Sequence, residues 1–176
     1  VAEARERLEA VIARNPGDRP ANMLLARLHG DGDRRLANEA LDRAYAAEPD
    51  NPEVMDALVE SLSRSRYDSE VAHLERAYVI ACRLMERHPD RVPRYARSLR
   101  TVFQRVLDLP RLEATGTLAQ LAPLWLAENR LSALHYELGQ VETLEDRLKI
   151  VEWHRQWGRR EETTIKPVQL SARPAI

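Results

Sequence analysis

Three stretches of this chain share one pattern, an amphipathic helix that stops at a proline and is soon followed by an aspartate. The stops are Pro16, Pro49 and Pro89, which are separated by 33 and 40 residues. Proline cannot continue a helix, and an aspartate after it can cap the next one. A phrase that recurs at intervals of about 20–50 residues is typical of helical repeat proteins, in which each unit packs on the next.

The hydrophobic periodicity predicts helices through most of the chain, and no run of alternating β-branched and aromatic residues indicates a sheet. The expected helices are 2–14, 19–29, 34–48, 52–66, 69–87, 92–107, 112–135 and 144–157. We therefore expect an all-α fold of antiparallel helix pairs. Ala44 is expected where the second helix of a pair crosses its neighbour closely. An irregular bundle of proline-terminated helices is the alternative.

The repeated phrase resembles the tetratricopeptide repeat, a unit of about 34 residues built from two antiparallel helices. The second helix carries the resemblance, with Ala37, Leu41, Ala44 and Tyr45 before Pro49. The first helix departs from it. The usual Trp, Gly and Tyr positions hold Asn22, Ala26 and His29 in one repeat, and Met55, Val59 and Leu62 in the next. The resemblance implies a short right-handed tetratricopeptide-like solenoid over residues 1–91, extra divergent C-terminal helices over 92–160, and a linker over 161–176.

Composition excludes several kinds of partner. The net charge is -1 and acidic and basic residues are interspersed, so the chain lacks the one-sided basic field that nucleic acid needs. No segment approaches the roughly 20 apolar residues that span a bilayer, and we expect no membrane partner. Cys82 is the only cysteine, which excludes an internal disulfide and favours a reducing, cytoplasmic location.

The residue types needed for catalysis form no recognisable pattern. No histidine pair has the i, i+4 spacing of a metal-binding helix, and no Cys/His cluster, nucleophile motif or phosphate-binding glycine loop occurs. The carboxylates alternate with arginines on helical faces, where they are typical of solvated ion pairs. We therefore expect no catalytic residue, no metal and no cofactor in this segment.

The C-terminal part carries a second resemblance. Residues 127–136 read AENRLSALHY, and they are followed by LEDR at 144–147 and EWHRQWG at 152–158. These phrases resemble the junction between the repeats and the catalytic domain in bacterial relatives of the O-linked N-acetylglucosamine transferases. The resemblance implies a catalytic domain that uses a nucleotide sugar and would begin where this sequence ends. It also implies domain-junction residues, which are His135, Tyr136, Trp153, His154 and Trp157.

In a repeat array the first helix of each unit lines the concave surface, so its exposed positions are the expected binding residues. Those positions are Met23, Arg27, Asp56, Glu60, Ser63, Arg97 and Arg100. We expect the segment to dock the acceptor protein or peptide of a protein O-glycosyltransferase. A second copy of the chain, in a homodimer, is a further candidate partner. The alternative function is a free-standing adaptor with no enzyme attached.

Overall fold

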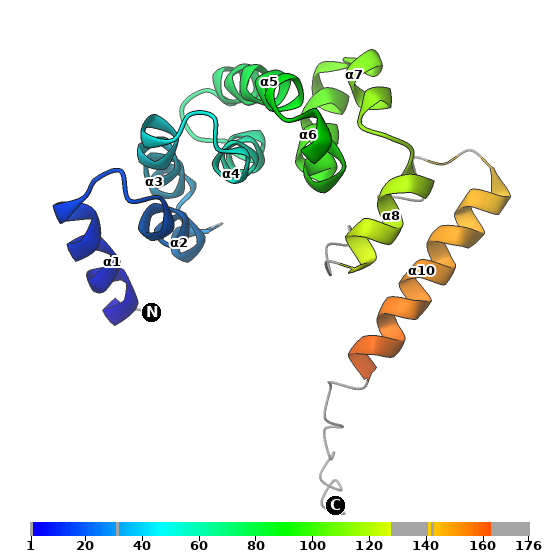
Figure 1. The fold of residues 1–176 in the computed structure, drawn as a ribbon, viewed down its shortest axis with the longest axis horizontal. Helices are drawn as coiled ribbons and strands as arrows, with labels where there is room; N and C mark the ends of the chain where they lie inside the picture. Colours follow the sequence, from blue (N-terminus) through cyan, green and yellow to red (C-terminus); the bar gives the residue numbers. More distant parts are fainter. Residues whose placement is uncertain (1, 31, 128–140, 142, 163–176) are drawn as a thin grey trace, which may run out of the picture. The chain divides into compact units, whose positions relative to one another are not determined.

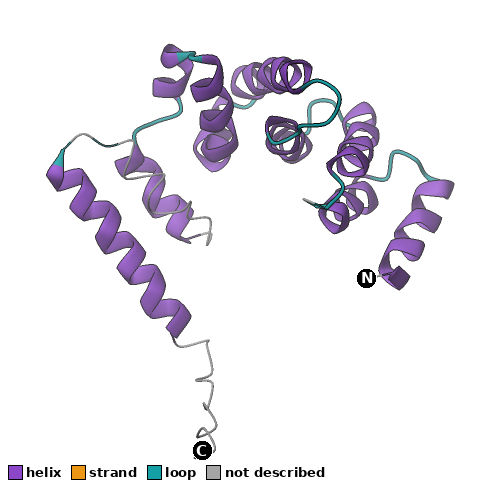
Figure 2. Ribbon diagram, turned by 180° about the vertical axis from the view of Figure 1, so that it is seen from behind, coloured by secondary structure: helices purple, strands orange, loops and turns teal. Residues whose placement is uncertain are grey.

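The computed structural model describes this chain except for residues 1, 31, 128–140, 142 and 163–176, and the secondary structure that it describes is entirely helical (Figure 1, Figure 2). The helices are α1 (Ala2–Arg14), α2 (Arg19–His29), α3 (Arg34–Ala47), α4 (Pro52–Ser63), α5 (Glu70–Arg87), the 3-10 turn η1 (Pro89–Arg91), α6 (Val92–Val106), α7 (Leu109–Ala114), α8 (Leu118–Ala127) and α10 (Leu144–Glu162). The expected all-α class is confirmed. The chain forms two compact units, Val1–Gly116 and Thr117–Ile176.

The proline stops fall where the pattern predicts them. Helices α1, α3 and α5 each end two residues before Pro16, Pro49 and Pro89. After the first stop, Asp18 accepts a 2.9 Å hydrogen bond from an amide in the first turn of α2. After the second, Asn51 accepts one of 3.0 Å in the first turn of α4. Both side chains satisfy amides that have no partner within the helix, so local chemistry fixes these helix starts.

Within the first unit, consecutive helices pack side by side in antiparallel fashion. Helices α2, α4 and α6 form one layer, and α3 and α5 form the other (Figure 1). Helix α4 contacts α3, α5 and α6, so it lies at the centre of the unit. The largest fully buried side chains of this core are Met55, Leu58, Leu62, Leu84, Leu99 and Phe103. The hydrophobic core therefore runs continuously through successive helix pairs, as in a helical repeat.

Charged pairs join neighbouring helix pairs at a sequence separation close to the expected repeat length of about 34 residues. In the described residues, five pairs of opposite charges that are 33–35 positions apart are joined by side-chain hydrogen bonds. They are Arg19–Glu53 (3.2 Å), Arg35–Asp68 (2.8 Å), Arg83–Asp50 (2.8 Å), Arg76–Asp42 and Arg105–Glu70. Equivalent positions meet in this way when successive units stack in the same orientation. The structure is thus compatible with a helical repeat.

The longer second interval is explained by a longer helix and a longer loop. Helix α5 has four residues more than α3, and the loop 64–69 has two more than its counterpart between α2 and α3. The buried side chain of Asn38 holds this loop. Its amide donates to Ser65 Oγ and to the Tyr67 hydroxyl, both at 2.8 Å, and its carbonyl accepts from Ser61 Oγ at 2.5 Å. A buried polar network with its partners in place fixes the loop against α3.

Helices α6 and α7 belong to the first compact unit, which ends at Gly116. The end of the repeats at residue 91 stays a prediction. Helix α6 packs on both α4 and α5. The helical region expected from residue 112 begins earlier in the structure, and a break at 115–117 divides it. Helix α7 begins at Leu109, because Pro110 is tolerated in a first turn, and the chain leaves it at Gly116, whose φ of 105° suits glycine.

The second unit is described in α8 and α10, which pack on each other. Leu121 and Trp125 of α8 and Ile150 of α10 are buried. Thr143 caps α10, since its Oγ accepts a 3.1 Å hydrogen bond from the Asp146 amide and donates one of 2.7 Å to the Asp146 carboxylate. Among the helices in the described parts of the chain, none combines the length and apolar character needed to cross a membrane.

Candidate functional site

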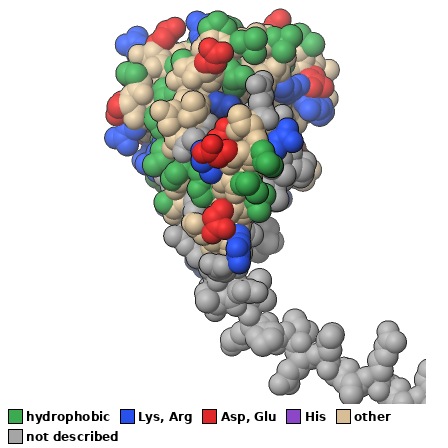
Figure 3. Space-filling view, turned by 90° about the vertical axis from the view of Figure 1, so that its right-hand side faces the viewer, with side chains coloured by type: hydrophobic (Ala, Val, Ile, Leu, Met, Phe, Trp, Pro, Cys, Tyr) green, Lys and Arg blue, Asp and Glu red, His purple; other side chains and the backbone are tan. Residues whose placement is uncertain are grey.

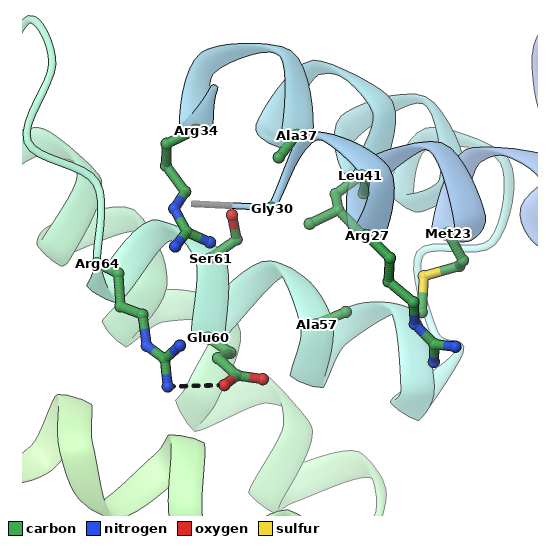
Figure 4. Close-up of a pocket in the computed structure, with 11 residues that line it drawn as sticks. Met23, Arg27, Gly30, Arg34, Ala37, Leu41, Ala57, Glu60, Ser61 and Arg64 are labelled. Atoms are coloured by element: carbon green, nitrogen blue, oxygen red, sulfur yellow. Dashed lines mark ion pairs between the residues drawn. The ribbon is translucent and has the colours of Figure 1, made fainter. Parts of the chain in front are cut away.

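A hollow of about 280 Å³ lies where α2, α3 and α4 converge, and we call it the α2–α4 hollow (Figure 4). It is lined by Met23, Ala26, Arg27, Gly30, Arg34, Ala37, Leu41, Ala57, Glu60, Ser61 and Arg64. Five of these side chains are alanine, glycine or serine. Protein interiors are close-packed, so a convergence of helices with little side-chain volume leaves unfilled space. The hollow is therefore a direct consequence of the small residues in the sequence.

Four charged side chains line this hollow. Arg64 and Glu60 form an ion pair at 2.9 Å, drawn as the dashed line in Figure 4. Arg27 comes from α2 and Arg34 from α3. Partial burial, followed by repulsion from Arg64, lowers the pKa of Arg34, and attraction to Glu60 opposes the shift. Three arginines and one glutamate around an apolar floor favour a ligand with an apolar group beside hydrogen-bond acceptors.

Three of the residues expected from the sequence lie together in this hollow. Met23 and Arg27 occupy successive turns of α2, and Glu60 faces them from α4. Met23 and Glu60 are half-buried and Arg27 is exposed, so a partner can reach all three. The structure thus places residues far apart in the sequence on one surface that a ligand can contact.

The other two residues expected on α4 serve contacts within the fold. The Asp56 carboxylate accepts a hydrogen bond from the Ser98 hydroxyl of α6. Ser63 was expected to be exposed, but it is buried, with only 3% of its surface exposed. Its carbonyl accepts a hydrogen bond from Arg105 of α6. The packing of α6 on α4 therefore covers the end of α4 that sequence periodicity left on the surface.

The two arginines expected on α6 lie outside the hollow. Arg97 is exposed. Arg100 donates 2.9 Å hydrogen bonds to Thr115 Oγ and to the Gly116 carbonyl. These bonds satisfy polar groups at the end of α7, so the Arg100 guanidinium acts in the fold.

The expected domain-junction residues are described only in part. Trp153 and His154 are half-buried on α10, and His154 Nδ1 lies 3.0 Å from the Ile150 carbonyl one turn earlier. His135 and Tyr136 lie outside the described residues, as does the side chain of Trp157. The docking role of all five residues stays a prediction.

The sequence analysis missed two lining residues, Arg34 and Arg64. Arg34 is the first residue of α3 and Arg64 directly follows the last residue of α4. The expected binding residues were positions inside the first helix of each pair only. Because α3 and α4 pack antiparallel, the start of one lies near the end of the other. Charged residues at opposite ends of antiparallel neighbours were the signal that would have found this pair.

The described residues offer no arrangement for metal chemistry, since no three His, Cys, Asp or Glu side chains among them are placed to hold an ion. The α2–α4 hollow is also no larger than the smallest small-molecule sites, which occupy roughly 300–1,000 Å³. The face in Figure 3 is the right-hand side of Figure 1, and positive and negative side chains are interspersed over its described part. A hollow of this volume has room for a small group such as a single side chain.

Comparison of the chain with protein-family models, with curated proteins and with solved structures gives no match. The class of protein is therefore defined by the fold and the site. It is an all-α protein with sequential antiparallel helix packing, compatible with a helical repeat.

Proposed function

We propose that this chain is a non-catalytic, protein-binding module of tetratricopeptide-like repeats arranged as a short right-handed solenoid. The observation that carries the proposal is the α2–α4 hollow, where an apolar floor lies beside charged side chains on the layer of first helices. A partner inserts an apolar side chain beside Met23 and Leu41. Its backbone and polar groups then bind Arg27 and Glu60.

The energetics of such a contact are modest. Full burial of one aliphatic or aromatic side chain contributes about 1.5–3 kcal/mol, and association consumes part of that gain. Hydrogen bonds to Arg27 and Glu60 add direction, because both side chains are charged and a partner must match them. We therefore expect weak to moderate affinity that falls as salt concentration rises.

The same proposal assigns the module to a protein O-glycosyltransferase, in which it docks the acceptor protein and carries the domain junction. Its support is the EWHRQWG phrase at 152–158. The alternative is a free-standing adaptor. The gene sequence beyond the codon for Ile176 separates the two. A long alternation of predicted strands and helices favours the transferase, and an early stop codon favours the adaptor.

The double variant Arg27→Ala/Glu60→Ala tests the binding role. It removes one charge of each sign from the hollow, so partner affinity is expected to fall roughly tenfold while folding is unchanged. The chain serves as bait in a lysate of the cells that make it. The captured protein is then purified, and its dissociation constant is measured for each variant.

A matched control is Arg5→Ala/Glu9→Ala, which removes the same two charge types from exposed positions of α1. It is expected to bind the captured protein like the parent chain. An equal loss of partner affinity in both variants would mean that the loss comes from the change in surface charge and not from the hollow. No loss in the hollow variant would leave this chain with a purely structural or dimerising role.

A further inference from the structure

A second hollow, of about 500 Å³, adjoins the α2–α4 hollow and shares Arg34 and Arg64 with it. We call it the arginine hollow. Its charged and aromatic lining consists of Asp33, Arg34, Arg35, Arg64, Arg66 and Tyr67. The Asp33 carboxylate caps α3, accepting a 3.1 Å hydrogen bond from the Leu36 amide. Among the described lining residues, four guanidinium groups thus surround one open space, and the one carboxylate is already engaged by backbone.

The arginine hollow is held in shape by partly buried contacts. The Tyr67 hydroxyl accepts a 2.8 Å hydrogen bond from buried Asn38, and the Tyr67 carbonyl lies 3.1 Å from His73 Nε2. The guanidinium of Arg35 stacks over the Tyr67 ring at 4.8 Å. A stacked guanidinium still presents its N–H groups in the plane of the fork. Arg34 and Arg35 begin α3, and Arg64 and Arg66 lie in the loop 64–69 that these contacts hold. A held loop lowers the entropy cost of binding.

The carboxylates near the arginine hollow can be exchanged for those of a partner. Three surface ion pairs lie at its edges, Arg64–Glu60, Arg35–Asp68 and Arg66–Glu70, and their side chains are 42–62% exposed. Exposed pairs of this kind contribute little to stability and are screened by salt. A partner that brings several carboxylates at once replaces them at little cost, since each guanidinium can donate two parallel hydrogen bonds to one carboxylate.

We propose that the arginine hollow binds a carboxylate-rich segment of the partner protein, a run of Asp or Glu residues next to the apolar side chain that enters the α2–α4 hollow. This inference rests on the proposed function and names the chemistry of its partner. Because Arg34 and Arg64 belong to both hollows, the apolar residue and the acidic run are adjacent in the partner sequence. The net charge of the whole chain is -1, so the chain as a whole does not attract acidic segments. The attraction comes from the arginines of this hollow.

The probe is a fluorescein-labelled hexaglutamate peptide with an N-terminal leucine, and anisotropy with the full chain at low salt is the measurement. We expect saturable binding that weakens as sodium chloride is added. Arg34→Ala/Arg64→Ala is expected to weaken it roughly tenfold or more, because two charge-assisted contacts are lost. Arg66→Ala, in the loop 64–69, is expected to weaken peptide binding by a smaller factor. Arg66 lies outside the helices, so this variant leaves the helix ends intact.

The control Arg14→Ala/Arg87→Ala removes two exposed arginines outside the hollow and should bind like the parent chain. Equal loss in this control would overturn the proposal, as would equal binding of a hexalysine peptide, or binding of a phosphoserine peptide or an oligothymidine as tight as that of the hexaglutamate. If the acidic peptide fails to bind while a captured partner remains sensitive to Arg27→Ala/Glu60→Ala, only this inference is wrong. If both fail, the proposed function fails as well.

Discussion

Replacing Phe103 by alanine is expected to lower the free energy of unfolding by about 3–5 kcal/mol. Phe103 is completely buried on α6, and its ring meets that of Tyr78 on α5 edge-on, with 6.1 Å between the centroids. The loss combines removed apolar area with the cavity that remains, because the surrounding helices relax only partly. Urea unfolding followed by circular dichroism measures the change.

A second variant, Phe103→Leu, keeps much of the side-chain volume and is expected to cost clearly less than the alanine variant. The comparison isolates packing from any general effect of substitution in α6. Most single substitutions cost about 1 kcal/mol. A loss below that value for the alanine variant would mean that α6 is not part of the hydrophobic core.

Enlarging Ala44 to tryptophan is expected to destabilise the chain by about 1–3 kcal/mol or more. Ala44 is completely buried on α3. The sequence pattern predicts that α3 crosses its neighbour closely at this small residue. An indole at such a crossing forces the helices apart or drives side chains out of their preferred rotamers. The melting temperature and the urea midpoint report the change.

The matched control is Ala46→Trp, two residues further along the same helix, where the alanine is exposed. Substitutions of this kind on the surface usually change stability by less than about 0.5 kcal/mol. An unchanged melting temperature in both variants would show that the repeat register assigned to α3 is wrong.

Much of the fold could be predicted from the sequence, because local chemistry determines it. The stops at Pro16, Pro49 and Pro89 and the cap at Asp18 depend on residues only a few positions apart. Local chemistry did not determine the start of α7, because Pro110 is equally compatible with ending a helix and with beginning one.

The candidate site was less predictable, because it depends on tertiary packing. Periodicity identified Met23, Arg27 and Glu60 as exposed positions of first helices, and the structure brings them together. It could not show that Ser63 is covered by α6, or that the ends of α3 and α4 meet at Arg34 and Arg64. Those facts follow only from how one helix pair packs on the next.

Site-specific photocrosslinking tests the central claim, that the α2–α4 hollow binds a protein partner. A photoreactive benzoylphenylalanine replaces Met23 in the hollow, and in a parallel strain it replaces Val79, which is 65% exposed on α5. Living cells of both strains are irradiated, so that crosslinks form with partners present in the cell. We predict a discrete crosslinked partner from position 23 that disappears with Arg27→Ala/Glu60→Ala and is absent from position 79. The same crosslinks from both positions, or none from position 23, would contradict the claim.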